Sequence, residues 1–177
     1  MPHTQRGWLA HPPALPRQLR PWLCDRGSLT KRLKARCSHF GVTPLSTGLA
    51  RALLDETVLL EGAHAQHAYV REVILSCDQR VVVFAHSVVR RASLRGVWNG
   101  ITRLGCHPLG ESLFNNPRIQ RQALVFRKLT HRHPLFRRID RYQTQTTRVL
   151  WARRSVFCLD QHPLLVTEVF LPAIDRL

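Results

Sequence analysis

The segment His162-Pro163-Leu164-Leu165-Val166-Thr167-Glu168-Val169-Phe170-Leu171-Pro172 is an apolar run that contains one carboxylate. Successive side chains of a β-strand point to opposite faces, so Glu168 would share its face with Leu164, Val166 and Phe170. A carboxylate among such neighbours needs a partner or a proton, because burying an unpaired charge is costly. The segment therefore predicts a buried strand with one polar side chain on its apolar face.

A second apolar run with a charge on one face is Tyr69-Val70-Arg71-Glu72-Val73-Ile74-Leu75. The same alternation places Arg71 on a face that is otherwise apolar. Residues 81–89 are another β-branched run and follow the short polar segment 77–80, so the two runs predict an antiparallel hairpin. Arg71 and Glu168 would then be two charged side chains directed from separate strands toward the interior.

A second hairpin is expected to close the chain, with strands over 149–159 and 164–171. Pairing the last residue of the first strand with the first residue of the second would place Ser155 opposite Glu168 and Arg153 diagonally beside it. Glu168 could then be half of a cross-strand ion pair with a structural role. The arginine of the first hairpin could equally pair with a nearby carboxylate.

Helical spacing of apolar residues and capping residues predict helices between the strands, at 14–24, 29–40, 94–104 and 134–139. Residues 42–60 read as extended or mixed. Early and central helices combined with consecutive hairpins predict a single α+β domain, in which helices cover one side of an antiparallel sheet. We expect residues 1–13 to be a disordered tail and residues 14–177 to be the folded domain.

The chain of 177 residues has a formal net charge of +16, and the charge is uneven. Between Arg118 and Arg154 there are eleven Lys or Arg residues and a single acid, Asp140. Such an excess favours an anionic partner, which could be a small polyanionic substrate, a nucleic acid or an acidic membrane surface. The alternative is a solvated basic face with no specific partner.

Five cysteines occur in the chain, and no pair of them has the spacing of a zinc ribbon. We expect reduced thiols in a reducing compartment, the cytoplasm, and no metal site. No apolar run approaches the roughly 18 residues needed to cross a bilayer. Glycine-rich nucleotide-binding motifs and a GxSxG nucleophile motif are also absent from the sequence.

Three motifs in a fixed order make the sequence similar to a known family. They are Tyr69-Val70-Arg71-Glu72-Val73, Leu104-Gly105-Cys106-His107-Pro108-Leu109-Gly110 with Leu113-Phe114, and Pro163-Leu164-Leu165-Val166-Thr167-Glu168-Val169-Phe170-Leu171-Pro172. The segments Asp25-Arg26-Gly27-Ser28-Leu29-Thr30 and Trp151-Ala152-Arg153-Arg154-Ser155 support them. From about residue 14 to its end, the sequence resembles the chorismate pyruvate-lyases, the 4-hydroxybenzoate synthases of bacterial ubiquinone biosynthesis.

The resemblance implies an α+β fold with an enclosed pocket under helical flaps. It implies cleavage of chorismate to 4-hydroxybenzoate and pyruvate, catalysed by a lyase without metal or organic cofactor. The family's pocket arginine and glutamate match Arg71 and Glu168, which are the expected catalytic residues. Its backbone contacts to the ligand match Leu29 and Leu109, so these four positions are the expected substrate-binding residues.

This sequence also departs from the family pattern. It has His86 where the family usually has arginine, and Arg90 where proline is common. A neutral histidine would be a weaker electrostatic partner than arginine, which puts a second anion contact from that strand in doubt. Arg90 or Arg91 could compensate for it.

Two other functions compete with the lyase. A non-catalytic domain that senses small carboxylates could share the fold, and the basic residues could bind nucleic acid. The second is disfavoured because the basic stretch lacks the aromatic patterns of known RNA-binding modules, and we expect no nucleic-acid partner. For the lyase, we expect a monomer whose basic surface could contact an anionic membrane.

Overall fold

The computed structural model describes residues 7–12, 14–60, 67–139, 142 and 147–177. Within these residues, seven strands form one sheet in the order β1-β2-β3-β7-β6-β4, and β5 pairs with β6 on the same edge as β4. All neighbouring strands are antiparallel. The strands are β1 (Phe40–Ala50), β2 (Ala68–Cys77), β3 (Arg80–Arg90), β4 (Gln120–Arg121), β5 (Val125–Leu129), β6 (Leu150–Leu159) and β7 (His162–Phe170). The expected α+β fold with an antiparallel sheet is confirmed.

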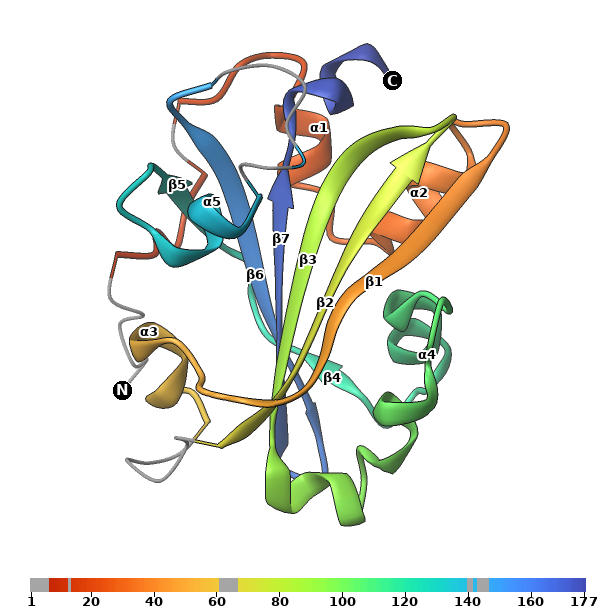
Figure 1. Cartoon of the computed structure of the whole chain (residues 1–177), viewed down its shortest axis with the longest axis vertical. Helices are drawn as coiled ribbons and strands as arrows, with labels where there is room; N and C mark the ends of the chain where they lie inside the picture. Colours follow the sequence, from red (N-terminus) through yellow and green to blue (C-terminus); the bar gives the residue numbers. More distant parts are fainter. Residues whose placement is uncertain (1–6, 13, 61–66, 140–141, 143–146) are drawn as a thin grey trace.

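The described part of the chain also contains five short α-helices, which lie outside the sheet (Figure 1). They are α1 (Arg20–Leu23), α2 (Leu29–Lys34), α3 (Leu54–Thr57), α4 (Leu109–Asn115) and α5 (Pro134–Ile139). Ser28 caps α2 as expected, because its hydroxyl accepts a hydrogen bond from the backbone N–H of Lys31 at 3.3 Å. The single helix expected at 94–104 is wrong. Two 3-10 segments, Arg91–Arg95 and Asn99–Arg103, stand there instead, and the chain turns between them at Gly96.

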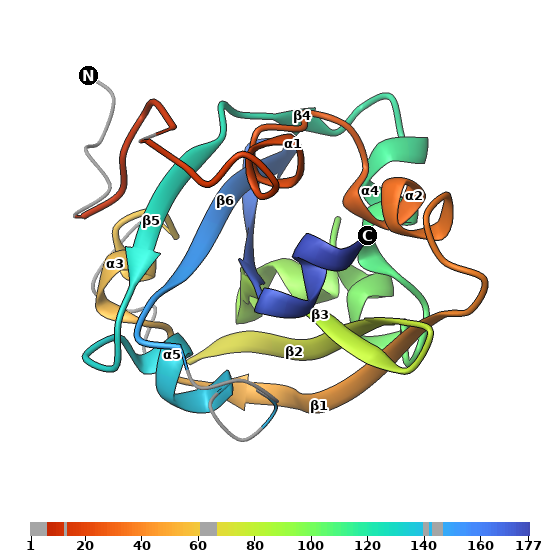
Figure 2. The same cartoon turned by 90° about the horizontal axis from the view of Figure 1, so that it is seen from above.

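Helices cover both faces of the sheet, and not one face as expected. The sheet is strongly curved, and α2 and α4 lie side by side across its concave face (Figure 2). On the opposite face, α5 packs into a cluster with buried side chains of β3, β6 and β7, including Phe84, Ala152 and Val169. The strands are therefore buried on both sides, which makes an inward-pointing charge on either face expensive to leave unpaired.

Both hairpins turn through the same dipeptide, Asp78-Gln79 in the first and Asp160-Gln161 in the second. All four residues have positive φ, from 47° to 66°, as a two-residue type I′ turn requires. The second turn pairs Leu159 with His162, two residues away from the expected register. As a result Arg153, and not Ser155, lies directly opposite Glu168.

The expected disordered tail at 1–13 is wrong for the part that the structure describes. Trp8 is buried, and its indole N–H donates to a carboxylate oxygen of Asp55 at 2.7 Å. Leu9 exchanges two backbone hydrogen bonds with Phe126 of β5. A tryptophan that can bury its ring and satisfy its N–H anchors this segment to the sheet. Residues 1–6 and 13 lie outside the described residues.

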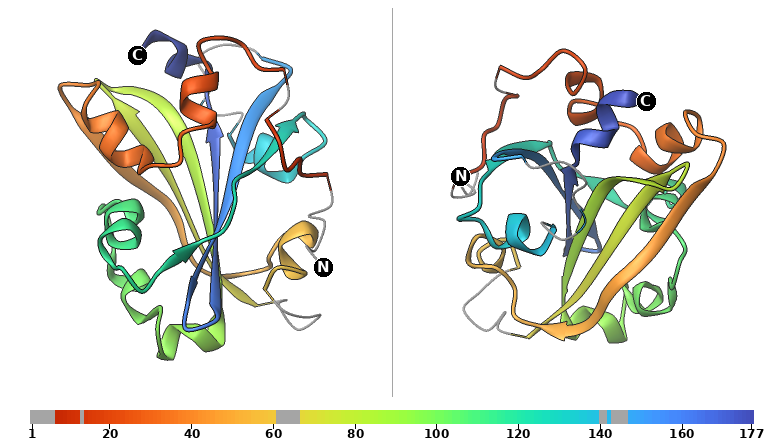
Figure 3. Two further views of the ribbon diagram at one scale, coloured as in Figure 1. Left: turned by 180° about the vertical axis from the view of Figure 1, so that it is seen from behind. Right: turned by 45° about the horizontal axis from the view of Figure 1, so that its top comes forward.

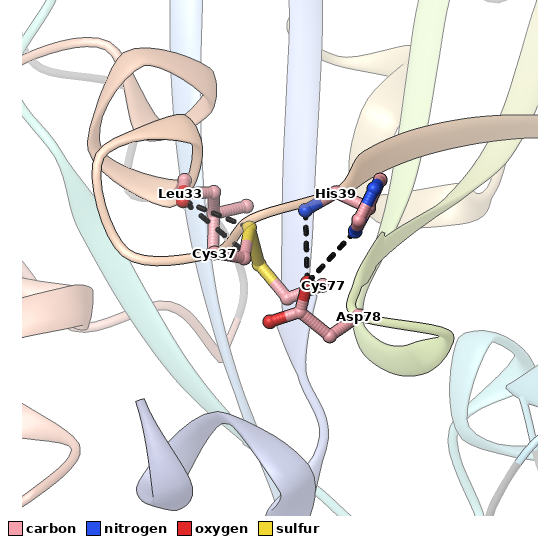
Figure 4. The surroundings of a disulfide bond; sticks show 5 residues. All are labelled: Leu33, Cys37, His39, Cys77 and Asp78. Atoms are coloured by element: carbon pink, nitrogen blue, oxygen red, sulfur yellow. Dashed lines mark hydrogen bonds and ion pairs between the residues drawn. A yellow bond between two sulfur atoms is a disulfide. The ribbon is translucent and has the colours of Figure 1, made fainter.

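The expectation of five reduced thiols is also wrong, because Cys37 and Cys77 form a disulfide (Figure 4). The bond joins the segment after α2 to the end of β2, with the two Cα atoms 5.3 Å apart. Next to it, the backbone N–H of His39 donates to the Asp78 carboxylate at 2.8 Å. Cys24, Cys106 and Cys158 carry no disulfide. The pairing could not be read from spacing, since the partners are 40 residues apart.

Reducing this disulfide is expected to lower the free energy of unfolding by about 2–4 kcal/mol, since a cross-link across a loop of this length restricts the unfolded chain. Chemical denaturation with and without dithiothreitol measures the difference. The variant Cys37→Ser/Cys77→Ser should be insensitive to the reductant, whereas Cys106→Ser, at an exposed free thiol, should respond like the parent protein. Equal stability of the parent protein in both conditions would contradict the expectation.

Candidate functional site

A pocket lies between the concave face of the sheet and the cover formed by α2 and α4. Its walls come from side chains of β2, β3, β6 and β7, and Arg121 of β4 reaches in from the edge. The free space, counted with its mouth, is about 560 Å³. Lys34 of α2 and Glu111 of α4 form an ion pair that joins the two covering helices. A ligand held here would be enclosed on most sides.

All four residues expected to bind substrate line this pocket: Leu29, Arg71, Leu109 and Glu168. Leu29 and Leu109 are the first residues of α2 and α4. The first N–H groups of a helix have no acceptor within the helix, so each helix leaves the amide of its first residue without an intrahelical partner. The two side chains are buried and shape the pocket wall. The fold thus brings together four residues that span 140 positions of the sequence.

Arg71 is a buried cation that has no carboxylate partner among the described residues. Its Nη2 donates to the backbone oxygens of Gly105 and His107, each at 2.9 Å. Its Nε has no hydrogen-bond partner in the part of the chain that the structure describes. Burial lowers the pKa of this guanidinium from its ordinary value. The group is held in place with donor capacity to spare, which suits it to bind an anion.

Glu168 accepts a hydrogen bond from Arg153 Nε at 2.5 Å. Arg153 is itself fixed by donating to the backbone oxygens of Trp22 at 2.9 Å and Asp25 at 2.6 Å. The cross-strand ion pair considered from the sequence is therefore present, at a register that makes it direct. Only Oε2 of Glu168 takes part, and Oε1 has no bond to any residue within the described ranges. Glu168 is thus ion-paired through Oε2 and can accept a hydrogen bond from a ligand through Oε1.

His86 does not belong to this pocket. Its neighbours Ala85 and Ser87 line the pocket, so strand alternation turns His86 to the opposite face of the sheet. There its Nδ1 lies 2.9 Å from Glu72 and its Nε2 lies 3.2 Å from Glu56. Burial alone would lower the pKa of His86, but the two carboxylates raise it to about 9. The expectation of a neutral histidine at pH 7 is wrong, and neither Arg90 nor Arg91 lines the pocket in its place.

Charged His86 is expected to make stability depend on pH. Its folded pKa of about 9 lies above the roughly 6.5 of an unfolded chain, so its contribution is complete below pH 6.5 and is lost as the pH rises through 9. The loss should be about 3 kcal/mol in the free energy of unfolding between pH 6 and 9.5. Denaturation at several pH values measures it. His86→Gln should flatten the profile, His107→Gln, at an exposed site, should not, and a flat parent profile would contradict the prediction.

Arg121 is the charged residue of the pocket wall that was not predicted from the sequence. It was counted only as one cation of the basic stretch, and its strand, β4, has two residues and no periodicity to read. The basic stretch 118–154 is less exposed to solvent than its charge suggests. Arg153 and Arg154 are almost fully buried, and Arg118 is paired with Asp160 at 2.7 Å. Much of the positive charge therefore serves the interior and the pocket.

No cluster of metal-ligating side chains was found among the described residues, which exclude His64. His67 and His131 are exposed. Within the described ranges, none of the helices has the length and apolar character to span a bilayer.

Solved structures share this fold at low sequence identity. The C-terminal domain of PhnF matches with a TM-score of 0.58 at 11% identity, covering 76% of this chain and 84% of that chain. The effector domain of PhnF from Mycobacterium smegmatis matches with a TM-score of 0.57 at 13% identity, covering 83% and 90%. A GntR-family ligand-binding domain from Bordetella bronchiseptica matches with a TM-score of 0.52 at 16% identity, covering 77% and 85%. These likenesses establish the fold alone.

Sequence comparison is more specific. A family model described as chorismate lyase matches residues 9–176. A probable chorismate pyruvate-lyase of Thiobacillus denitrificans is 55% identical over 170 residues, covering 96% of this chain and 91% of the relative. A protein of the same name from Nitrosomonas europaea is 49% identical, covering 96% of each. Identity at this level over nearly the whole length, with the pocket described above, shows that the chain belongs to the chorismate lyase family.

Proposed function

We propose that this chain is a chorismate lyase, a carbon–oxygen lyase that converts chorismate to 4-hydroxybenzoate and pyruvate. The observation that carries the proposal is the pocket arginine Arg71, a buried guanidinium without a carboxylate partner among the described residues, opening into the same enclosed space as Glu168. Such a site suits a small carboxylate that also carries a hydroxyl group. Membership of the family supports the choice of chorismate.

The proposed reaction needs few protein groups. The ether bond between the ring and the enolpyruvyl oxygen breaks, and its electrons form the new carbonyl of pyruvate in concert with hydrogen transfer. The hydrogen on the hydroxyl-bearing ring carbon moves to the enolpyruvyl methylene, which becomes the methyl group of pyruvate. The ring gains its third double bond and becomes aromatic. All atoms stay within the substrate, so the step requires neither a nucleophile nor a metal or organic cofactor.

The protein would supply a reactive conformer in a dry site. Arg71 would hold a carboxylate, the backbone N–H groups of Leu29 and Leu109 would add donors, and Oε1 of Glu168 would accept the hydrogen bond of the ring hydroxyl. The Arg153 guanidinium fixes the carboxylate of Glu168 in place. The cover of α2 and α4 would exclude water while the ether is folded toward the ring.

Ultraviolet spectroscopy tests the proposal. Purified protein is incubated with chorismate, and 4-hydroxybenzoate is followed by its absorbance and pyruvate by a coupled lactate dehydrogenase assay. We expect both products in equal amounts. A folded protein that releases neither product would overturn the proposal and leave a non-catalytic carboxylate sensor as the alternative.

We also propose where this protein works and which molecules it contacts. The protein would work in the cytoplasm as a monomer, with chorismate and 4-hydroxybenzoate as its ligands, no nucleic-acid partner and peripheral contact with anionic membranes. Exposed basic residues on and near α2, such as Lys31 and Arg26, support the membrane contact. Sedimentation with anionic liposomes at low salt tests it, and failure to co-sediment would count against it.

A further inference from the structure

The substrate of the proposed reaction has two carboxylates, whereas its aromatic product has one. The ring carboxylate remains in 4-hydroxybenzoate, and the enolpyruvyl carboxylate leaves with pyruvate. Arg71 can bind only one of them in the bidentate manner that favours arginine. A second cation in the pocket is therefore needed if both negative charges are to be removed from water without a large cost.

Arg121 meets this requirement. Its Nε donates to Ser155 Oγ at 2.9 Å, and its Nη1 donates to the backbone oxygen of Arg26 at 2.6 Å. Nη2 has no hydrogen bond to any residue that the structure describes, and no carboxylate in the described ranges pairs with this guanidinium. Its Cζ lies 5.3 Å from the ring centroid of Phe114 and 5.3 Å from that of Phe157, and the two rings restrict its movement. The group is thus fixed on the pocket wall with one donor nitrogen free.

The charge balance of the pocket also favours a ligand with two negative charges. Its lining contains three cations, Arg71, Arg121 and Arg153, and one anion, Glu168, which gives 3 − 1 = +2. Burial and the nearby charge of Arg153 lower the pKa of Arg121 to about 10, so it is still protonated at neutral pH. A dianion would neutralise this pocket, whereas a monocarboxylate would leave one excess positive charge.

The positions of the two arginines match the positions of the two carboxylates. Arg71 stands on β2 and Arg121 on β4, with β3, β7 and β6 between them in the sheet. β4 follows α4 and runs along the outer edge of the sheet (Figure 3). In chorismate the ring carboxylate lies para to the hydroxyl, and the enolpyruvyl ether lies ortho to it. A hydroxyl held at Glu168 would direct the para carboxylate away toward Arg71 and the ortho ether toward the side of Arg153 and Arg121.

We propose that Arg121 binds the enolpyruvyl carboxylate of chorismate through its free Nη2, while Arg71 binds the ring carboxylate. This assignment deepens the proposed function and rests on it. Arg121 is then a substrate-specificity residue, because it distinguishes the dianionic substrate from the monoanionic product. It also replaces the second anion contact that was in doubt on the strand of His86.

The assignment predicts that a substitution of Arg121 weakens binding of the substrate but not binding of the aromatic product. Arg121→Gln should raise KM for chorismate by about 10- to 100-fold, the range expected when a charge-assisted hydrogen bond is lost. The same variant should change the dissociation constant of 4-hydroxybenzoate, measured by calorimetry, by less than about twofold, since the product lacks the second carboxylate. Arg71→Gln should weaken both ligands. Arg118→Gln, which removes an exposed arginine outside the pocket, should change neither.

A matched pair of inert ligands gives a measurement on the unaltered protein. 3-(Carboxymethoxy)-4-hydroxybenzoate carries the second carboxylate on the ether, and 3-ethoxy-4-hydroxybenzoate has the same ring and a neutral ether. We expect the dianion to bind at least about tenfold more tightly, and Arg121→Gln to abolish most of this advantage. Arg121→Lys should keep part of it, because the charge remains and the planar fork is lost.

Three results would overturn the assignment: equal affinity of the unaltered protein for the two ligands, an unchanged KM in Arg121→Gln, or equal weakening of chorismate and 4-hydroxybenzoate by that variant. Circular dichroism and thermal unfolding establish that each variant is folded, and the ligand pair still gives an answer if Arg121→Gln is not. Failure of the proposed function looks different. In that case the unaltered protein itself would release no product from chorismate.

Discussion

Arg71→Gln is expected to lower kcat/KM for chorismate by about 100- to 1000-fold while the protein remains folded. A buried, charge-assisted contact to a carboxylate is typically worth several kcal/mol, and a hundredfold to a thousandfold loss corresponds to about 2.7–4 kcal/mol. The guanidinium is held by the carbonyl oxygens of Gly105 and His107, so it needs little reorganisation when the substrate arrives. Steady-state kinetics with chorismate measures the change.

Arg71→Gln is also expected to leave the stability of the protein nearly unchanged. Arg71 makes no ion pair with any described residue, and burial penalises its charge. Replacing it with glutamine removes a buried charge and strands no carboxylate, which offsets the loss of the two hydrogen bonds to the backbone oxygens of Gly105 and His107. The free energy of unfolding should therefore stay nearly constant. Arg103→Gln, at an exposed arginine in the 3-10 segment before the pocket loop, is the control for charge and should keep both activity and stability. Near-normal turnover by Arg71→Gln would refute the assigned site.

Glu168→Gln should also reduce turnover, but it is a less decisive variant. Its carboxylate is the ion-pair partner of Arg153, which is 1% exposed, so the substitution leaves a buried guanidinium without its counter-charge. Loss of activity would then combine a missing contact to the ring hydroxyl with a disturbed pocket wall. A substitution of Arg71 therefore tests ligand binding without disturbing the fold, whereas a substitution of Glu168 affects both.

Strand alternation is a pattern that depends only on neighbouring residues. It placed Arg71 and Glu168 on inward faces before any tertiary contact was known, and the structure places both in one pocket. The register was predicted less well. A turn through Asp160 and Gln161 requires positive φ at both residues, and neither is glycine, so the sequence offered no strong type I′ signal.

The sequence contains a pattern that indicates burial of the sheet on both faces. The stretch 81–89 of β3 is apolar at nearly every position, a pattern typical of strands that are covered on both sides. Its two polar residues are His86 and Ser87, and His86 was interpreted as a pocket residue because the family usually has arginine there. Glu72 lies directly opposite His86 in the first hairpin, but Glu56 comes from α3, and no local pattern connects Glu56 to His86. Arg121 and the Cys37–Cys77 disulfide were missed for the same reason, since each depends on contacts made only after folding.

Glu56→Gln is expected to destabilise the protein by about 3–5 kcal/mol, the largest effect on folding that we predict. Glu56 is fully buried, and its Oε1 lies 3.2 Å from His86 Nε2 and 3.3 Å from Arg154 Nη2. Burial would raise the pKa of Glu56, but His86 and Arg154 hold it below its usual value, so the group is an anion between two cations. A neutral side chain would leave both cations buried with too little counter-charge.

A double variant tests whether charge is the cause. His86→Gln removes one of the stranded cations, so Glu56→Gln/His86→Gln should be more stable than Glu56→Gln alone, whereas a packing defect would make the two losses add. Glu111→Gln, at a half-exposed ion pair, should cost less than about 1 kcal/mol. The network lies on the face of the sheet opposite the pocket, so KM per folded molecule should change little. A loss below about 1 kcal/mol in Glu56→Gln would show that the charges on this face do not hold the sheet and its helices together.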